Sequence, residues 1–328
     1  MRKRDVRVAV VALAAAMTIG VPAAAADTKS ATYLKSGGSS QARVSNIVVH
    51  SGAMDRDVPF VVIKPKDASK PRGVLYLFNG AGGGETVNNW ITKTDIVKFL
   101  SDKNVYVVIP MAGAATYYTD WQKPDPRLGV NKWSTFLGKE LPPIIAATYN
   151  TNGRNAVGGI SGTATSSLNL AIEYPGQYQA VSSFSGCAST TDPIGEAAVR
   201  SVVELRGQAN ATNMWGPYGG PGWRAHDPTL NAARLRGTAL FIATAPGTPG
   251  PYDTPQYVSD PGALANQLVV GGILEAGAQQ CTLNFLRRLG ELKIPATVDM
   301  PPAGTHSWGY FQDMFHNAWP FFAKALHA

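Results

Sequence analysis

The sequence has few cysteines and few charged residues. Of its 328 residues only two are cysteines and 16% are charged, with 29 Lys and Arg against 22 Asp and Glu. No His or Cys stands at ligand spacing near either cysteine, so we expect no metal site and no cofactor. The sequence also lacks a basic cluster with interleaved aromatic residues, which argues against nucleic acid as a partner.

Long apolar runs are absent after the first 26 residues. Within those residues, four basic side chains precede the apolar stretch 8–21, and small residues follow it up to Ala26. This order is typical of a secretory signal peptide, and the apolar stretch is short for a membrane span. We therefore expect residues 1–26 to be cleaved near Ala26, leaving a protein that is secreted or peripherally associated with the cell envelope. A retained N-terminal anchor is the alternative.

The two cysteines, Cys187 and Cys281, lie in a chain that is expected to be exported. An even number of cysteines in an oxidising compartment favours a disulfide between them. A pair of buried free thiols is the alternative.

Short apolar or β-branched runs alternate with segments of helical period after a polar stretch, 27–42, which we expect to be a flexible leader. Strands are predicted at 44–50, 59–64, 73–79, 105–110, 154–160, 180–184, 239–244 and 296–300. Helices are predicted at 93–103, 133–149, 162–174, 264–277, 281–292 and 310–326. This alternation implies an α/β fold in which helices cover both faces of a mostly parallel central sheet. Residues 43–328 are expected to form one domain, with the first two strands as an antiparallel hairpin at an edge.

A nucleophile elbow is indicated where the predicted strand 154–160 passes directly into the predicted helix 162–174. Between them lies Ser161, with Gly159 two residues before it, in the position where this tight turn requires a small residue. Thr163 stands where the general pattern has a second glycine. The strand, serine and helix together predict an α/β-hydrolase fold with Ser161 as its nucleophile.

A serine nucleophile needs a base and an acid, which follow it along the chain in this fold. Of the five histidines, His306 lies after the last predicted strand and before the C-terminal helix, where the base is expected. The order of strands favours Asp253 or Asp260 as the acid, whereas Glu275 would pass as a helix-surface carboxylate. The residues alone leave this choice open.

An oxyanion hole needs two backbone N–H groups directed at the developing charge. One is expected from Gly162, directly after the nucleophile, and the other from Ala81, in the glycine-rich turn 79–84 that follows the strand 73–79. A phosphate-binding role for this turn is excluded, because it lacks both the spacing and the Lys-Ser/Thr ending of a P-loop.

The chain resembles the secreted mycolyltransferases of mycobacteria and corynebacteria, the antigen 85 family, from about Ser51 to Phe322. The motifs that carry this resemblance are Tyr76–Gly80 with Asn88 and Trp90, Tyr117–Trp121, Lys132–Leu137 with Glu140–Pro142, Asn213–Pro217 with Trp223 and Asp227, and Pro302 with Gly304–Trp308. The resemblance implies that Glu275 is the acid, because the family's glutamate lies slightly more than thirty residues before its histidine.

The resemblance also implies substrate contacts from Asn79, Asn88 and Trp308. Mycobacterial members have Asp and Arg in the first loop to hold trehalose, where this chain has Asn79 and Gly82. Trehalose binding is therefore not carried over directly, because a guanidinium fork is missing. Position 162, usually Met in the family, is Gly here.

Three functions follow as hypotheses. The first is an acyltransferase that moves a mycolyl group from a trehalose ester, through a Ser161 acyl-enzyme, to a hydroxyl of a sugar, a polysaccharide or a protein. The irregular, aromatic-rich segments 206–231 and 246–261 would wall an apolar groove for its lipid chain. The second is a secreted carboxylesterase with the same triad, and the third is a non-catalytic adhesion or envelope protein on a hydrolase scaffold.

Overall fold

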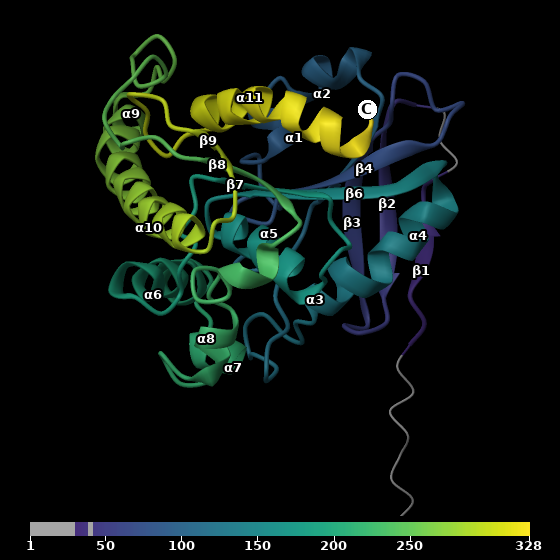
Figure 1. Cartoon of the computed structure of the whole chain (residues 1–328), viewed down its shortest axis with the longest axis horizontal. Coiled ribbons are helices and arrows are strands. Elements are labelled where there is room, and N and C mark those ends of the chain that lie inside the picture. The colour runs from purple at the N-terminus through teal and green to yellow at the C-terminus, as the bar shows by residue number, and fades with distance from the viewer. Residues whose placement is uncertain (1–29, 39–41) are drawn as a thin grey trace, which may run out of the picture.

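The computed structural model describes residues 30–38 and 42–328. The predicted signal peptide, 1–26, lies outside these ranges. None of the helices in the described part of the chain combines the length and apolar character that a bilayer crossing requires. Figure 1 shows a central sheet with helices above and below it.

The sheet has nine strands in the order β1-β2-β3-β5-β4-β6-β7-β8-β9. The pairs from β1 to β5 are antiparallel and all those from β5 to β9 are parallel, which confirms the mostly parallel sheet and the antiparallel hairpin of β2 and β3. The hairpin is not at the edge as predicted, because β1 pairs outside β2. The strands are β1 (Tyr33–Ser36), β2 (Val44–Ser51), β3 (Arg56–Ile63), β4 (Arg72–Phe78), β5 (Val105–Pro110), β6 (Thr151–Ile160), β7 (Ala180–Phe184), β8 (Ala239–Ala243) and β9 (Thr297–Asp299).

The prediction of a flexible leader over residues 27–42 is wrong for residues 33–36. They form β1, which pairs with β2 at the outer edge of the sheet, with Tyr33 opposite His50. The stacked rings of these two residues, 5.0 Å apart, strengthen the pairing. The strand has no alternating apolar pattern of its own, and besides its pairing with β2 it is held by the ion pair of Lys35 with Asp57 of β3 and by Leu34, which packs against the core.

Two cores fill the space between sheet and helices. One lies beneath α1 (Trp90–Lys93), α2 (Ile96–Phe99) and α11 (Trp308–Leu326), around Trp90, Phe315 and Phe322. The other lies on the opposite face, beneath α3 (Trp133–Thr135), α4 (Leu141–Thr148), α5 (Gly162–Glu173) and α10 (Gly272–Glu291). The buried, apolar parallel strands thus hold the elbow between two packed layers.

Several helices differ from their predicted limits. The predicted helices 264–277 and 281–292 are instead α9 (Pro261–Asn266), a π-helical turn η5 (Gln267–Gly271), and α10, which continues through Gly277 without a break. The helix α6 (Pro193–Arg200) was not predicted at all. Within the irregular segment 206–231, α7 (Ala211–Trp215) and α8 (Pro221–Ala225) form a third core of Trp and Tyr side chains.

Candidate active site

Ser161 lies in a strained turn between β6 and α5. Its φ is 58°, in the left-handed region that non-glycine residues rarely adopt, and its N–H donates to the Phe184 carbonyl at 2.9 Å. A Cβ on Gly159 would lie 2.3 Å from the Thr163 carbonyl oxygen, so this position admits only glycine. Strain of this kind exposes the serine hydroxyl above the sheet in a nucleophile elbow.

Thr163 fits the elbow in spite of its size. Its buried hydroxyl donates to the Ile160 carbonyl at 3.0 Å and accepts from the Ile160 N–H at 3.2 Å. The threonine therefore bonds the last residue of β6 to the first turn of α5, where a glycine would leave both groups without this partner.

Glu275 and His306 form a hydrogen-bonded pair. Their Oε2 and Nδ1 atoms are 2.7 Å apart, and the Glu275 side chain is fully buried. The other carboxylate oxygen accepts from the Ser185 hydroxyl at 2.7 Å, the Thr244 hydroxyl at 3.0 Å and the Ala245 N–H at 2.8 Å. Glu275 therefore holds the imidazole through Nδ1, and Nε2 is the ring nitrogen that this pair leaves open to another partner.

The other two candidate acids have different partners. Asp253 accepts from the Thr305 hydroxyl at 2.5 Å and the Tyr310 hydroxyl at 2.6 Å, and so anchors the loop that carries His306. Burial opposes its charge, but the hydrogen bonds prevail and hold its pKa below the usual value. Asp260 caps the N-terminus of α9 by accepting from the Ala263 N–H at 2.6 Å. Neither carboxylate is bonded to His306 in the described residues.

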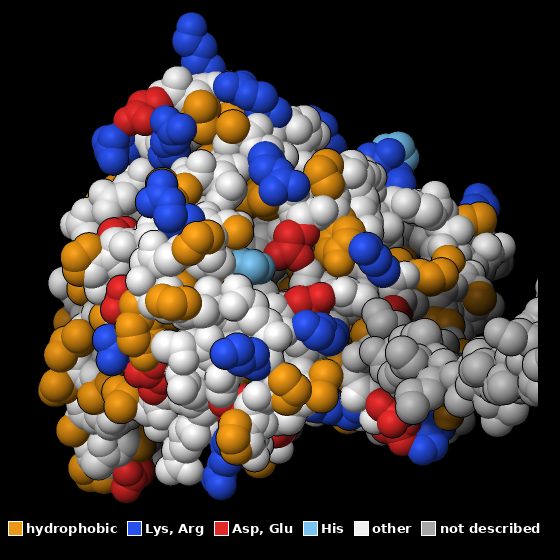
Figure 2. Space-filling model, turned by 90° about the horizontal axis from the view of Figure 1, so that it is seen from below, with side chains coloured by type: hydrophobic (Ala, Val, Ile, Leu, Met, Phe, Trp, Pro, Cys, Tyr) orange, Lys and Arg blue, Asp and Glu red, His pale blue; other side chains and the backbone are white. Residues whose placement is uncertain are grey.

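Ser161 and His306 line the same pocket, which has a volume of about 320 Å³. In the described part of the chain, the His306 side chain is bonded to Glu275 and no hydrogen bond joins it to the Ser161 side chain. The apolar walls of this pocket come from α6, the π-helical turn η3 (Ser201–Arg206) and α10, through Ile194, Ala197, Ala198, Val202, Ile273, Leu274 and Ala278. Apolar side chains also gather at the left of Figure 2, the side on which α6 and α10 lie in Figure 1.

The glycine-rich turn lies against Ser161. A Cβ on Gly80 would be 3.6 Å from the Ser161 Cβ, so the backbone at Ala81 passes beside the serine. The Ala81 carbonyl accepts from the Ala115 N–H at 2.8 Å, while neither the Ala81 nor the Gly162 N–H has an acceptor among the described residues. Both amides are therefore available to an oxygen atom at Ser161.

The expected sugar contact of Asn79 is not supported. Its side chain is completely buried, donates to the Pro110 carbonyl at 2.9 Å and accepts from the Trp90 N–H at 3.0 Å. The amide of Asn79 therefore supports the turn from inside, because both ends of this side chain are already hydrogen-bonded to backbone.

Asn88 and Trp308 line a second, larger cavity together with His306. This cleft has a volume of about 730 Å³, and its other polar or aromatic walls are Lys93, Tyr252, Tyr257, Asn266, Gln267, Ser307 and Gln312. The prediction that both irregular segments wall the apolar groove is therefore wrong. The segment 246–261 contributes to this polar cleft. The segment 206–231 belongs to the third core, because the rings of Trp215 and Trp223 pack against each other.

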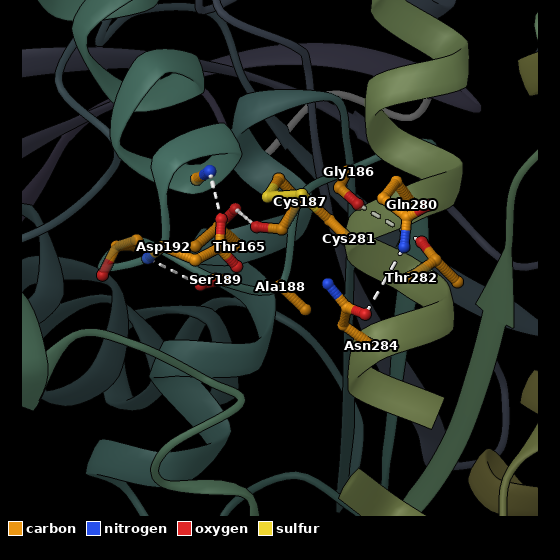
Figure 3. Close-up of a disulfide and its surroundings, with 12 residues drawn as sticks. Thr165, Gly186, Cys187, Ala188, Ser189, Asp192, Gln280, Cys281, Thr282 and Asn284 are labelled. Atoms are coloured by element: carbon orange, nitrogen blue, oxygen red, sulfur yellow. Dashed lines mark hydrogen bonds between the residues drawn. A yellow bond between two sulfur atoms is a disulfide. The ribbon is translucent and has the colours of Figure 1, made fainter. Parts of the chain in front are cut away.

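The prediction of a disulfide between Cys187 and Cys281 is confirmed. Figure 3 shows that it joins the loop after β7 to α10, beside a hydrogen bond of 2.7 Å from the Thr165 hydroxyl to the Cys187 carbonyl. The residues before Cys187 were missed by sequence reasoning. Ser185 bonds Glu275, and a Cβ on Gly186 would lie 2.7 Å from the Ser161 carbonyl oxygen. The sequence did offer one signal for them: both directly follow a predicted parallel strand, at the end of the sheet where the site lies.

The described residues contain no group of three or more His, Cys, Asp or Glu side chains that could hold a metal ion. On the face shown in Figure 2, Lys and Arg side chains are spread out rather than gathered in one patch.

The fold and the elbow define a protein of the α/β-hydrolase class, as predicted. Within this class the chain belongs to the family described as putative esterase, which its residues 51–322 match. The resemblance to the antigen 85 family is also confirmed. The chain is 28% identical to the Mycobacterium tuberculosis protein named diacylglycerol acyltransferase/mycolyltransferase Ag85A, over 98% of this chain and 92% of that protein.

A solved structure supports the same relationship. The crystal structure of Mycobacterium tuberculosis MPT51 superposes with a TM-score of 0.71 at 26% identity, covering 87% of this chain and 99% of that one. The Staphylococcus aureus serine hydrolase FphF, at 16% identity and a TM-score of 0.62, shares the fold. The family description and the name of Ag85A support an enzyme that transfers acyl groups, with esterase-like chemistry.

Proposed function

We propose that this protein is an exported serine acyltransferase that moves a long-chain acyl group of the mycolyl type from a sugar ester to a hydroxyl acceptor. Ser161 is the nucleophile, His306 the base, and Glu275 the acid that orients it. The Ala81 and Gly162 N–H groups form the oxyanion hole. The mycolyltransferase name of Ag85A, together with the hydrogen-bonded Glu275–His306 pair, supports this assignment.

The observation that carries the proposal is the position of His306 between two cavities. Its side chain lines the apolar pocket that contains Ser161 and also the polar cleft that contains Asn88 and Trp308. One imidazole can therefore serve an acyl chain on one side and a polyhydroxyl acceptor on the other.

In the first half of the reaction, Nε2 of His306 takes the Ser161 proton as the hydroxyl oxygen attacks the ester carbonyl. The tetrahedral oxyanion accepts hydrogen bonds from the two backbone N–H groups. When this intermediate collapses, the imidazolium returns its proton to the departing sugar oxygen, and the acyl group remains on Ser161 as an ester.

In the second half, an acceptor hydroxyl in the polar cleft gives its proton to Nε2 as its oxygen attacks the carbonyl of the acyl-enzyme. The bond from the acyl group to the Ser161 oxygen then breaks, this oxygen takes the proton back from Nε2, and the acceptor keeps the acyl group as an ester. Asn88 and Trp308 are proposed to bind the sugar of the donor in the first half of the reaction and the sugar of the acceptor in the second half. The donor is a trehalose ester, and the acceptor is a second sugar ester, an envelope polysaccharide or a protein hydroxyl. Export to the cell envelope brings the enzyme to these partners.

Incubation of the protein with an acyl-trehalose donor, with and without a polyol acceptor, tests the proposal. We expect a new acyl ester of the acceptor, and an intact-mass increase on the peptide that contains Ser161. The Ser161→Ala variant should lose both signals as well as labelling by a fluorophosphonate. Free acid as the only product would make the protein an esterase, and an unlabelled wild-type serine would contradict both activities.

A further inference from the structure

A guanidinium group lies over the glycine-rich turn beside the nucleophile. Arg206 is the last residue of η3, and its Nη2 atom is 3.2 Å from the position that a Cβ on Gly82 would take. Because Gly82 has no side chain, the Arg206 side chain, which comes from η3, can occupy the space above it. Gly82 is also the position where the sequence departs from the resemblance.

The backbone that carries Arg206 is fixed against this turn. A Cβ on Gly207 would lie 2.5 Å from the Ala115 Cβ, and the Ala115 N–H donates to the Ala81 carbonyl. At the other end of η3, the Val202 side chain would be 3.6 Å from a Cβ on Gly162. The segment therefore follows the rim of the site from one proposed oxyanion donor to the other.

The charge of Arg206 has no partner among the described residues, since no hydrogen bond or ion pair engages its guanidinium there. The carboxylates of neighbouring segments have other partners. Glu204 is paired with Arg200 at 3.0 Å, and Glu85 accepts from the Gly113 and Ala114 N–H groups at 2.9 Å. The donors of Arg206 are thus free for a ligand.

The distance to the reacting atoms is short. Gly82 is two residues after Gly80, whose Cβ position is in van der Waals contact with the Ser161 side chain. The chain turns here, with the Gly83 N–H donating to the Gly80 carbonyl at 2.9 Å, so Gly80 and Gly82 are less than about 7 Å apart and the guanidinium lies at the rim of the site that contains Ser161.

We propose that Arg206 is a specificity-determining residue that binds hydroxyl oxygens of the sugar headgroup on the donor ester. This inference rests on the proposed function and adds a contact that the sequence motifs do not contain. A planar guanidinium offers five N–H donors in a fixed fork, which suits adjacent hydroxyls of a sugar ring. An ammonium group offers no such fork, so lysine is a poor substitute.

The test compares two esters with the same short acyl chain, one on trehalose and one on p-nitrophenol, which has no polyol headgroup. For Arg206→Ala, we expect KM for the trehalose ester to rise about tenfold relative to KM for the p-nitrophenyl ester, the size of one charged hydrogen bond. Arg206→Lys should recover only part of this loss. Arg200→Ala is the matched control from the end of α6, directly before η3, and it should leave the ratio unchanged.

A second variant moves the arginine from position 206 to position 82. The double variant Gly82→Arg with Arg206→Ala places a guanidinium on the same side of the turn, and it should regain most of the lost preference for the trehalose ester. Fluorophosphonate labelling at the wild-type rate verifies that each variant is folded.

Two results would overturn the inference: an unchanged KM ratio in Arg206→Ala, or an equal change in Arg200→Ala. A wild-type protein that turns over neither ester would instead refute the proposed function, on which the inference rests.

Discussion

Three carboxylates, Asp253, Asp260 and Glu275, have different donors in the folded chain, and these donors separate their roles. Only Glu275 faces an imidazole, at 2.7 Å, and three further donors hold its other oxygen. A Gln at this position would place an N–H₂ group against either those donors or the Nδ1 proton of His306. Charge and geometry therefore both require a carboxylate.

We expect Glu275→Gln to lower kcat on a short p-nitrophenyl ester by at least about a hundredfold, because the imidazole loses its orientation and the partner of its positive charge. Asp260→Asn, which keeps a helix-capping oxygen, should leave kcat close to that of the wild type. Nearly full activity in Glu275→Gln would remove this residue from the proposed triad.

Glu173 provides a pH-dependent prediction. Burial, and secondly the charge of Asp120, raise its pKa from 4.5 to about 7, against the opposing effect of Arg234. The folded state thus binds a proton that the unfolded state releases, so the free energy of unfolding falls as pH rises from about 4.5 to about 7. In Glu173→Gln this fall should be smaller, with a gain of roughly 1–3 kcal/mol at pH 8. Urea unfolding at several pH values measures the free energy of unfolding of both proteins. If this free energy changes with pH in the same way in Glu173→Gln and in the wild type, the prediction is contradicted.

At the scale of the element, the strand–turn–helix around Ser161 depends on a glycine that packs against the backbone. In Gly159→Ala the new methyl would meet the Thr163 carbonyl at 2.3 Å, and a backbone atom cannot move aside cheaply. We expect a loss of about 1–3 kcal/mol or more. Gly290→Ala in α10 is the control, because no atom lies within 4 Å of its Cβ and helix propensity should add about 0.5–1 kcal/mol. Equal urea midpoints for both variants would show that the turn is not constrained in this way.

Elements that are buried on both faces could be predicted well from sequence. The limits of β5 and β7 match their predicted limits: β5 is an apolar run, and all five residues of β7 are buried although Ser182 and Ser183 are polar. The edge strand β1 and the helix α6 were missed. The four residues of β1 show no clear alternation of apolar and polar side chains, and α6 is only eight residues long and buries only Gly195 and Val199.

At the scale of the whole molecule, the disulfide joins residues 94 positions apart and connects the loop behind Ser161 to the helix that carries Glu275. Closing so long a loop restricts the unfolded chain, so we expect reduction to lower the free energy of unfolding by about 2–5 kcal/mol. Guanidinium unfolding with and without reductant measures this loss. The double variant Cys187→Ala with Cys281→Ala should unfold at the same midpoint in both conditions, and a wild type that is insensitive once its thiols are shown to be free would contradict the prediction.

The sequence by itself determined the parallel sheet, the elbow at Ser161 and the order of serine, acid and histidine, because these depend on local apolar runs, small residues and chain direction. The family resemblance implied Glu275, and the tertiary structure shows it bonded to His306. Only the tertiary structure decided that Asn79 faces inward and that Arg206 covers Gly82. These relations join residues that are 31 to 124 positions apart, or depend on which face of a turn is buried. The packing of several elements at once sets such distances, so no single stretch of the sequence contains them.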